Sequence, residues 1–76
     1  MSAPMSLKDI AFLSGHTHKT INPVLEQLGY VQRTHRGYRL TELGREIAVE
    51  VDRGSTVSTY WDATSIVKIL PQLKLN

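Results

Sequence analysis

The sequence predicts a small α+β fold, and three observations support this prediction. Its 76 residues suffice for one domain. Apolar residues recur at helical spacing over residues 7–28, β-prone runs flank glycine-containing turns over residues 30–61, and a further helical stripe follows. We therefore expect one domain over residues 1–76, with two helices and a hairpin in residues 6–41 and a helix, a second hairpin and a closing helix in residues 42–76.

The first helix is predicted from the signals at its two ends. Ser6 can cap it, and Asp9 three residues later completes a capping-box-like pair. Apolar residues at helical spacing then extend from about Leu7 to Leu13. Gly15 follows and can take the positive φ angle that ends a helix.

The second helix carries a proline that leaves its start open. Its apolar stripe consists of Ile21, Val24, Leu25 and Leu28. Thr17 is one capping candidate, and a helix beginning there has Pro23 one turn inside it and must bend. In the alternative, Asn22 is the cap and Pro23 is the first helical residue. We favour the start near Thr17.

Two hairpins are predicted in the rest of the chain. The first has β-prone strands over residues 30–34 and 38–41, on either side of the turn His35-Arg36-Gly37. Thr41 then caps a short helix over residues 42–47. The remaining elements are a strand over residues 48–52, a turn over 53–55, a strand over 56–61, and a helix over 63–70 that Asp62 caps and Pro71 ends.

The positive charge is concentrated in the first half of the chain. Residues 1–41 hold five Lys and Arg against two Asp and Glu, which is 5 − 2 = +3, and residues 42–76 hold four against five, which is −1. All three histidines also lie in the first half. This asymmetry favours an anionic partner that binds the N-terminal half.

The motifs resemble those of a known fold. The "L-x-x-L-G-Y-V" exit of the second helix and the "YRLTELG" exit of the first hairpin resemble the winged helix-turn-helix regulators of bacteria, phages and archaea. The continuation "LTELGREIAVEVDRG", followed by "YWDATSIVKIL", resembles the DNA-binding segments of phage antirepressor and Rha-type regulatory proteins. The resemblance covers residues 6–70 and departs from the usual pattern in Pro23 and in leaving no room for a helix before Ser6. The closing helix or a second subunit would take the place of that helix.

The resemblance implies a regulator, phage- or prophage-related, that binds double-stranded DNA as a symmetric homodimer. The sequence shows neither a membrane-spanning apolar run nor a signal-peptide pattern, so we expect a cytoplasmic protein. The second helix would lie in the major groove and read base edges through Thr17, His18, Lys19, Thr20 and Asn22. The first hairpin would be the wing, with Arg36 on a phosphate or in the minor groove and His35 adding charge when protonated. Phosphate contacts are expected from Lys8, Arg33 and Arg39.

Other functions are weaker readings of the same residues. His16, His18 and His35 could form a metal site, since His-x-His brings two imidazoles near each other, but no third ligand occurs at a recognisable spacing, so no metal or other cofactor is expected. No nucleophile motif or phosphate-binding glycine loop occurs, and the spacing of Glu42, Glu46 and Glu50 indicates a solvated helix face, so we expect no enzyme and no small-molecule ligand. Tyr60 and Trp61 are expected in the core. The alternative function is a winged-helix protein–protein module such as an antirepressor.

Overall fold

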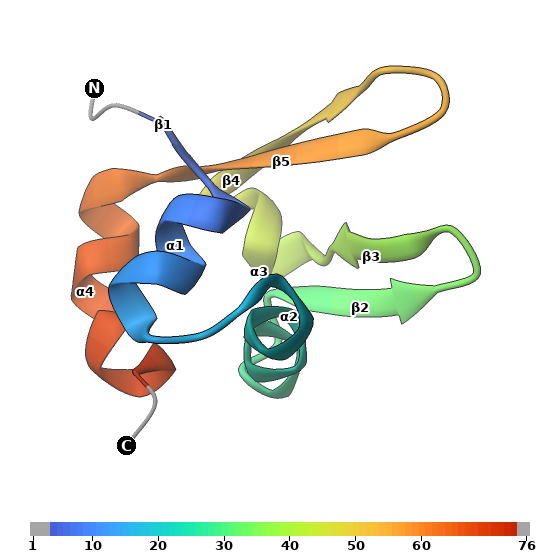
Figure 1. The fold of residues 1–76 in the computed structure, drawn as a ribbon. Helices are drawn as coiled ribbons and strands as arrows, with labels where there is room; N and C mark the ends of the chain where they lie inside the picture. The colour runs from blue at the N-terminus through green and yellow to red at the C-terminus, as the bar shows by residue number, and fades with distance from the viewer. Residues whose placement is uncertain (1–3, 75–76) are drawn as a thin grey trace.

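The helices gather at one end of the molecule and two hairpins project from the other end (Figure 1). The computed structural model describes residues 4–74, which form an α+β structure, as the sequence predicts. Its elements are β1 (Pro4–Ser6), α1 (Leu7–Ser14), α2 (His18–Gln27), β2 (Val31–Thr34), β3 (Gly37–Leu40), α3 (Glu42–Arg45), β4 (Ala48–Asp52), β5 (Val57–Asp62) and α4 (Ala63–Leu73).

The strands form two antiparallel sheets. The first is the β2–β3 hairpin alone, and the second has the order β1-β5-β4, so that β5 lies between a short N-terminal strand and its own hairpin partner. Strand β1 is not predicted by the sequence. It pairs Pro4 with Asp62 and Ser6 with Tyr60, and it therefore covers only the last part of β5.

The helix starts follow the predicted caps. The Ser6 and Asp9 capping box is present at the start of α1, and Gly15 ends that helix with φ of 80°. Helix α2 begins at His18 with Thr17 as its N-cap, so the start near Thr17 is confirmed and the start at Asn22 is wrong. Pro23 lies inside α2.

The predicted end of the closing helix at Pro71 is wrong. Helix α4 continues through Pro71 to Leu73, whose side chain is fully buried. A proline inside a helix removes one backbone hydrogen bond and crowds the preceding turn. Burial of a leucine side chain contributes about 1.5–3 kcal/mol, which offsets much of that cost.

One cluster of buried side chains unites the helices and both hairpins. It takes residues from all three longer helices and from β2, β3, β4 and β5, namely Ile10, Ala11, Ile21, Leu25, Val31, Leu40, Ala48, Trp61, Ile66 and Leu73. Helix α4 packs against α1 and α2, so the third helix of the core comes from the same chain. Trp61 is 1% exposed and meets the ring of Tyr30 edge to face, which confirms its predicted place in the core.

Gly44 marks a close approach between α3 and the loop before β2. A Cβ atom placed on Gly44 would lie only 2.0 Å from the carbonyl oxygen of Tyr30. Only glycine permits this contact, because a backbone carbonyl cannot move aside as a flexible side chain can. The approach brings α3 against the base of the β2–β3 hairpin.

Candidate nucleic-acid interface

At the start of α2, some of the side chains predicted to bind DNA form hydrogen bonds within the helix cap, and others have no partner among the described residues. Thr17 and Thr20 form a capping box, in which the Thr17 backbone N–H donates to Thr20 Oγ1 at 2.9 Å. Both threonines are exposed, but their hydroxyls belong to the cap. His18 and Lys19 are exposed and Asn22 is half-buried, and no hydrogen bond or ion pair within residues 4–74 engages these three side chains.

His16 supports the turn between α1 and α2. Its Nε2 donates to the Leu73 carbonyl at 2.7 Å, and its Nδ1 lies 3.0 Å from Thr20 Oγ1. Both ring nitrogens are therefore occupied. Over the described residues 4–74, no group of three or more histidine, cysteine or acidic side chains is placed to hold a metal ion.

The turn of the β2–β3 hairpin is held by Thr34. Its hydroxyl donates to the Gly37 carbonyl at 2.7 Å and accepts from the Arg36 backbone N–H at 3.1 Å. Gly37 has φ of 95°, and such a glycine after two turn residues is typical of tight hairpins. The arrangement leaves the side chains of Arg33, His35 and Arg36 exposed at the outer part of the hairpin.

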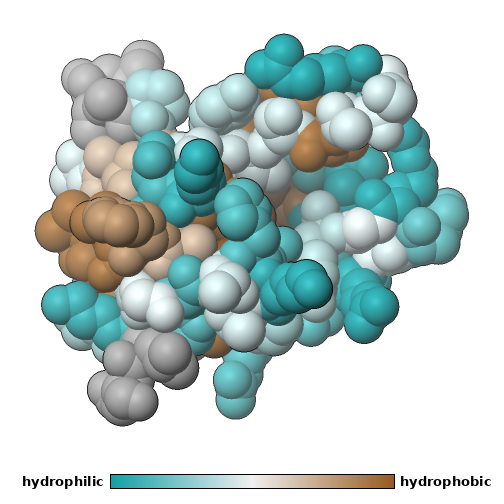
Figure 2. Space-filling view, viewed as in Figure 1, coloured by the Kyte–Doolittle hydropathy of each residue, from teal (hydrophilic) through white to brown (hydrophobic). Residues whose placement is uncertain are grey.

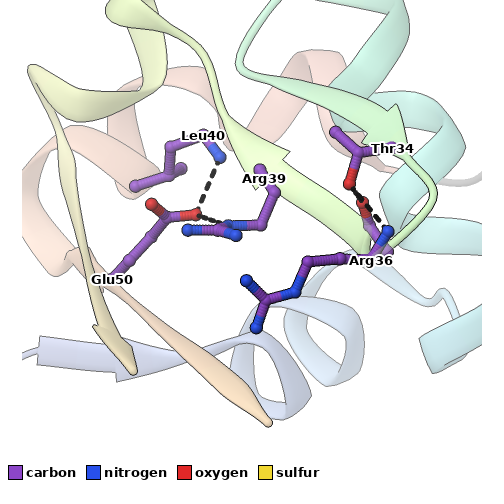
Figure 3. A network of polar contacts seen from close by, with 6 residues as sticks. Thr34, Arg36, Arg39, Leu40 and Glu50 are labelled. Carbon is purple, nitrogen blue, oxygen red and sulfur yellow. Dashed lines mark hydrogen bonds and ion pairs between the residues drawn. The ribbon is translucent and has the colours of Figure 1, made fainter. Parts of the chain in front are cut away.

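Arg39, unlike the other predicted cations, has an acidic partner within residues 4–74. Its Nε donates to Glu50 Oε2 at 2.9 Å, and the same oxygen accepts from the Leu40 backbone N–H at 3.1 Å (Figure 3). This ion pair joins β3 to β4, and the phosphate contact expected of Arg39 stays a prediction. Glu50 lies on a strand, with only 14% of its side chain exposed, so the predicted solvated helix face does not include it.

The ion pair shifts the pKa of both partners. The hydrogen bond from Arg39 lowers the pKa of Glu50 below its ordinary value, against the opposing effect of burial, and the Leu40 N–H lowers it further. The same hydrogen bond from Glu50 raises the pKa of Arg39. Glu50 is therefore ionised at neutral pH and holds the two hairpins together as an anion.

A groove of about 490 Å³ lies between the two hairpins and the N-terminal ends of α1 and α2. Four predicted side chains from three separate segments line it, namely Lys8, His18, Asn22 and Arg36. Arg36 extends from its turn toward the β4–β5 hairpin (Figure 3), and the surface is hollowed between the two hairpins (Figure 2). The fold thus places polar and cationic side chains from residues 8–36 of the chain together along the rim of one groove.

The groove also has walls that sequence reasoning does not identify as part of a site. Tyr38 lines it from β3, and residues 57–61 line it from β5. Tyr60, expected in the core, is half-buried and borders this groove, and its hydroxyl accepts from Arg53 at 3.0 Å. No sequence pattern near these residues predicts that they line a groove, because their position depends on how β5 pairs with β1 and β4.

Six predicted residues lie outside the groove lining. Thr17 and Thr20 form the cap of α2 and Arg39 pairs with Glu50, whereas Lys19, Arg33 and His35 are exposed but do not line the groove. In the sequence, Lys19 and His35 are next to the lining residues His18 and Arg36, and Arg33 is two residues from the lining residue Val31. These three exposed side chains therefore lie near the groove without joining its wall.

Within the described residues 4–74, no helix has both the length and the apolar character required to cross a membrane. Comparison of the chain with protein-family models, with characterised proteins and with solved structures finds no match. The geometry of the groove and its rim is therefore the basis for a functional assignment.

Proposed function

We propose that the chain is a winged helix-turn-helix regulator that binds double-stranded DNA in a sequence-specific manner. The observation that carries this proposal is the convergence of Lys8, His18, Asn22 and Arg36 on one groove. No hydrogen bond or ion pair within residues 4–74 engages these four side chains, so they are available to a ligand. The cations suit an anionic backbone, and cationic contacts to phosphates dominate the affinity of DNA-binding proteins.

The two parts of the surface have different tasks. In this proposal Asn22 and His18, on α2, contact base edges, since an asparagine can pair with adenine through two hydrogen bonds. Lys8 and Arg36 approach from either side of α2 and contact phosphates, which fix the orientation of the protein on the duplex. Lys19, Arg33 and His35 extend the phosphate contacts at the edge of the same surface.

The test is the salt dependence of binding to a labelled random duplex about 30 base pairs long, followed by fluorescence anisotropy. The wild type is expected to bind at about 50 mM salt and to weaken steeply toward about 200 mM. The double variant Lys8→Ala/Arg36→Ala should lower the slope of log K against log salt by about 1.8, because each lost phosphate contact removes about 0.9.

The matched control is Arg45→Ala/Lys74→Ala, which removes the same charge from two exposed residues on α3 and at the end of α4. This control should keep the wild-type slope within about 0.3, since it leaves every proposed phosphate contact in place. Equal slopes for the two double variants would reject the groove as the DNA surface. An absence of binding by the wild type at low salt would reject DNA binding itself.

A second candidate is a protein–protein module, which the exposed apolar side chains of β4 favour. Val49 and Val51 lie on the same face of that strand and are 61% and 38% exposed. A partner protein that stays bound after nuclease treatment, and that is lost on Val49→Gln/Val51→Gln, would support this function. That result together with no DNA binding would replace the first proposal.

A further inference from the structure

The turn between α1 and α2 runs beside the last turn of α4 (Figure 1). It begins at Gly15, whose positive φ ends α1, and Thr17 already caps α2. His16 is therefore the single residue between the two caps, and its backbone N–H donates to the Ala11 carbonyl at 2.8 Å. The direction in which α2 leaves α1 thus depends on how His16 is held.

The half-buried His16 side chain lies in a chain of hydrogen bonds that joins the start of α2 to the end of α4. A carbonyl can only accept, so Nε2 carries the hydrogen that is donated to the Leu73 carbonyl at 2.7 Å. In the neutral ring Nδ1 is then an acceptor, and it accepts from the hydroxyl of Thr20 at 3.0 Å. The same hydroxyl oxygen accepts from the Thr17 N–H at 2.9 Å, so each donor in the chain has an acceptor.

The Leu73 carbonyl is a fixed anchor for this chain of hydrogen bonds. The last carbonyls of a helix have no partner within the helix, so the carbonyl of Leu73 is open to a donor from another segment. The Leu73 side chain is fully buried in the core, which holds the end of α4 in place. His16 therefore ties the first turn of α2 to a point that the core fixes.

We propose that His16 is a positioning residue for the base contacts of α2, a role that rests on the proposed function. Of the four groove-lining residues that carry that function, His18 and Asn22 lie on the first two turns of α2. Lys8 lies on α1, and Arg36 lies in the turn of the β2–β3 hairpin. A change in the direction of α2 therefore displaces the base contacts and leaves the phosphate contacts of Lys8 and Arg36 in place.

Sequence preference and salt dependence separate these two kinds of contact. The wild type first selects its preferred sequence from a pool of randomised duplexes, and fluorescence anisotropy then compares the selected duplex with a random one. His16→Ala should lower the ratio of these two affinities by about tenfold or more, because displaced side chains lose their base contacts. The slope of log K against log salt should fall by no more than about 0.9, the share of Lys19, because Lys8 and Arg36 keep their contacts.

Two conservative variants separate the two hydrogen bonds of the ring. His16→Gln places an amide nitrogen near the position of Nε2 and can still donate to the Leu73 carbonyl, so it should recover most of the affinity ratio. His16→Asn reaches only as far as Nδ1 and loses the link to α4, so it should behave like His16→Ala.

The control for stability is Ser14→Ala, compared at a temperature at which circular dichroism shows every variant folded. It removes a buried hydroxyl that donates to the Ile10 carbonyl at 2.7 Å. That hydrogen bond lies within α1, so its loss should leave the affinity ratio at the wild-type value. A Ser14→Ala variant that lost the ratio as His16→Ala does would show a general effect of stability and overturn the role of His16.

The free protein tests the same link without DNA. Residual dipolar couplings of the backbone amides measure the angle between α1 and α2, and His16→Ala should change this angle while His16→Gln and Ser14→Ala keep it. An unchanged angle in His16→Ala, or an unchanged affinity ratio, would overturn the role of His16 and leave the DNA function intact. A wild type that binds no DNA would reject the proposed function, whereas the couplings would still decide whether His16 positions α2.

Discussion

The β2–β3 and β4–β5 hairpins leave the body of the molecule in the same direction, yet their cations are used differently (Figure 1). At the tip of β2–β3, no hydrogen bond or ion pair within residues 4–74 engages the guanidinium of Arg36. At the tip of β4–β5, Arg53 donates to the hydroxyls of Ser58 and Tyr60 at 3.2 and 3.0 Å. The tip of the first hairpin keeps its charge available to a ligand, whereas Arg53 at the tip of the second supports its own strands.

The two hairpins also differ in how they contact the hydrophobic core. The β2–β3 hairpin is anchored at its base by Val31 and Leu40, and the turn beyond them is exposed. Strand β5 instead carries Trp61, the largest of the fully buried side chains, into the centre of the fold. The two hairpins thus have the same shape but different roles, with β2–β3 available for binding and β4–β5 contributing to stability. Substitutions in the two hairpins should therefore affect different properties of the protein.

The largest effect is expected from Trp61→Ala. Removal of a buried tryptophan side chain costs about 3–5 kcal/mol, which is a large part of the stability of a small domain. Thermal unfolding followed by circular dichroism should therefore show little folded protein at 37 °C. Gln32→Ala, on the exposed face of β2, should stay within about 0.5 kcal/mol of the wild type.

Trp61→Phe sharpens the same test. The indole Nε1 is buried without a hydrogen-bond partner in the described part of the chain, so phenylalanine loses ring area but leaves no polar group unpaired. The variant should fold and unfold cooperatively at a lower temperature than the wild type. If Trp61→Ala unfolded within a few degrees of the wild type, the β4–β5 hairpin would not have the structural role assigned to it.

An intermediate effect is expected from Glu50→Ala, which breaks the link between the two hairpins. The substitution leaves the Leu40 N–H without its acceptor, and an unsatisfied buried donor costs about 1–3 kcal/mol. Urea denaturation at neutral pH measures the loss. Glu46→Ala removes the same charge from an exposed position at the end of α3 and should cost less than about 0.5 kcal/mol.

The link should also depend on pH. The pKa of Glu50 is lower in the folded chain than the ordinary 4.5, so its ionised form is favoured by folding. Its contribution is therefore complete above the ordinary value and is lost as the pH falls through the lower, folded value. The stability difference between the wild type and Glu50→Gln should shrink over that acid range, and a difference that stays constant would show that the charge of Glu50 contributes nothing.

The smallest effect is expected from Gly37→Ala in the turn of the β2–β3 hairpin. Gly37 has φ of 95°, and a Cβ atom there would meet nothing within 4 Å, so the cost is backbone strain alone, about 1–2 kcal/mol. The melting temperature should fall by about 5–10 °C. Gly37→Asn should cost less, since asparagine tolerates positive φ better than alanine. A rise in melting temperature for Gly37→Ala would contradict this reading of the turn.

Local signals predicted most of the elements correctly. The caps Ser6, Thr17, Thr41 and Asp62 all start the helices expected of them, and β4 has its predicted bounds, Ala48–Asp52. These features depend on residues that are neighbours in the chain, so the sequence specifies them directly. For the same reason, sequence analysis could select four candidate binding residues that line the groove, from their positions on predicted helices and a predicted turn. They are Lys8, His18, Asn22 and Arg36.

Features that depend on distant partners could not be predicted in this way. Strand β1 exists because β5 offers an edge to Pro4–Ser6, and three residues that include a proline carry no strand signal of their own. The sequence likewise cannot distinguish the paired Arg39 from the free Arg36, because the carboxylate that binds Arg39 comes from β4. Helix α4 passes Pro71 because the core has a place for Leu73.

The hydrogen bond from His16 to Leu73 has a consequence for the order in which the chain can fold. It joins residues 57 positions apart, and it ties the turn that orients α2 to the last turn of α4. During synthesis, the N-terminal segment that carries most of the candidate site emerges first but lacks this support. We expect α2 to reach its final orientation only after Leu73 has left the ribosome, so that a nascent chain stalled before this residue would have no completed site.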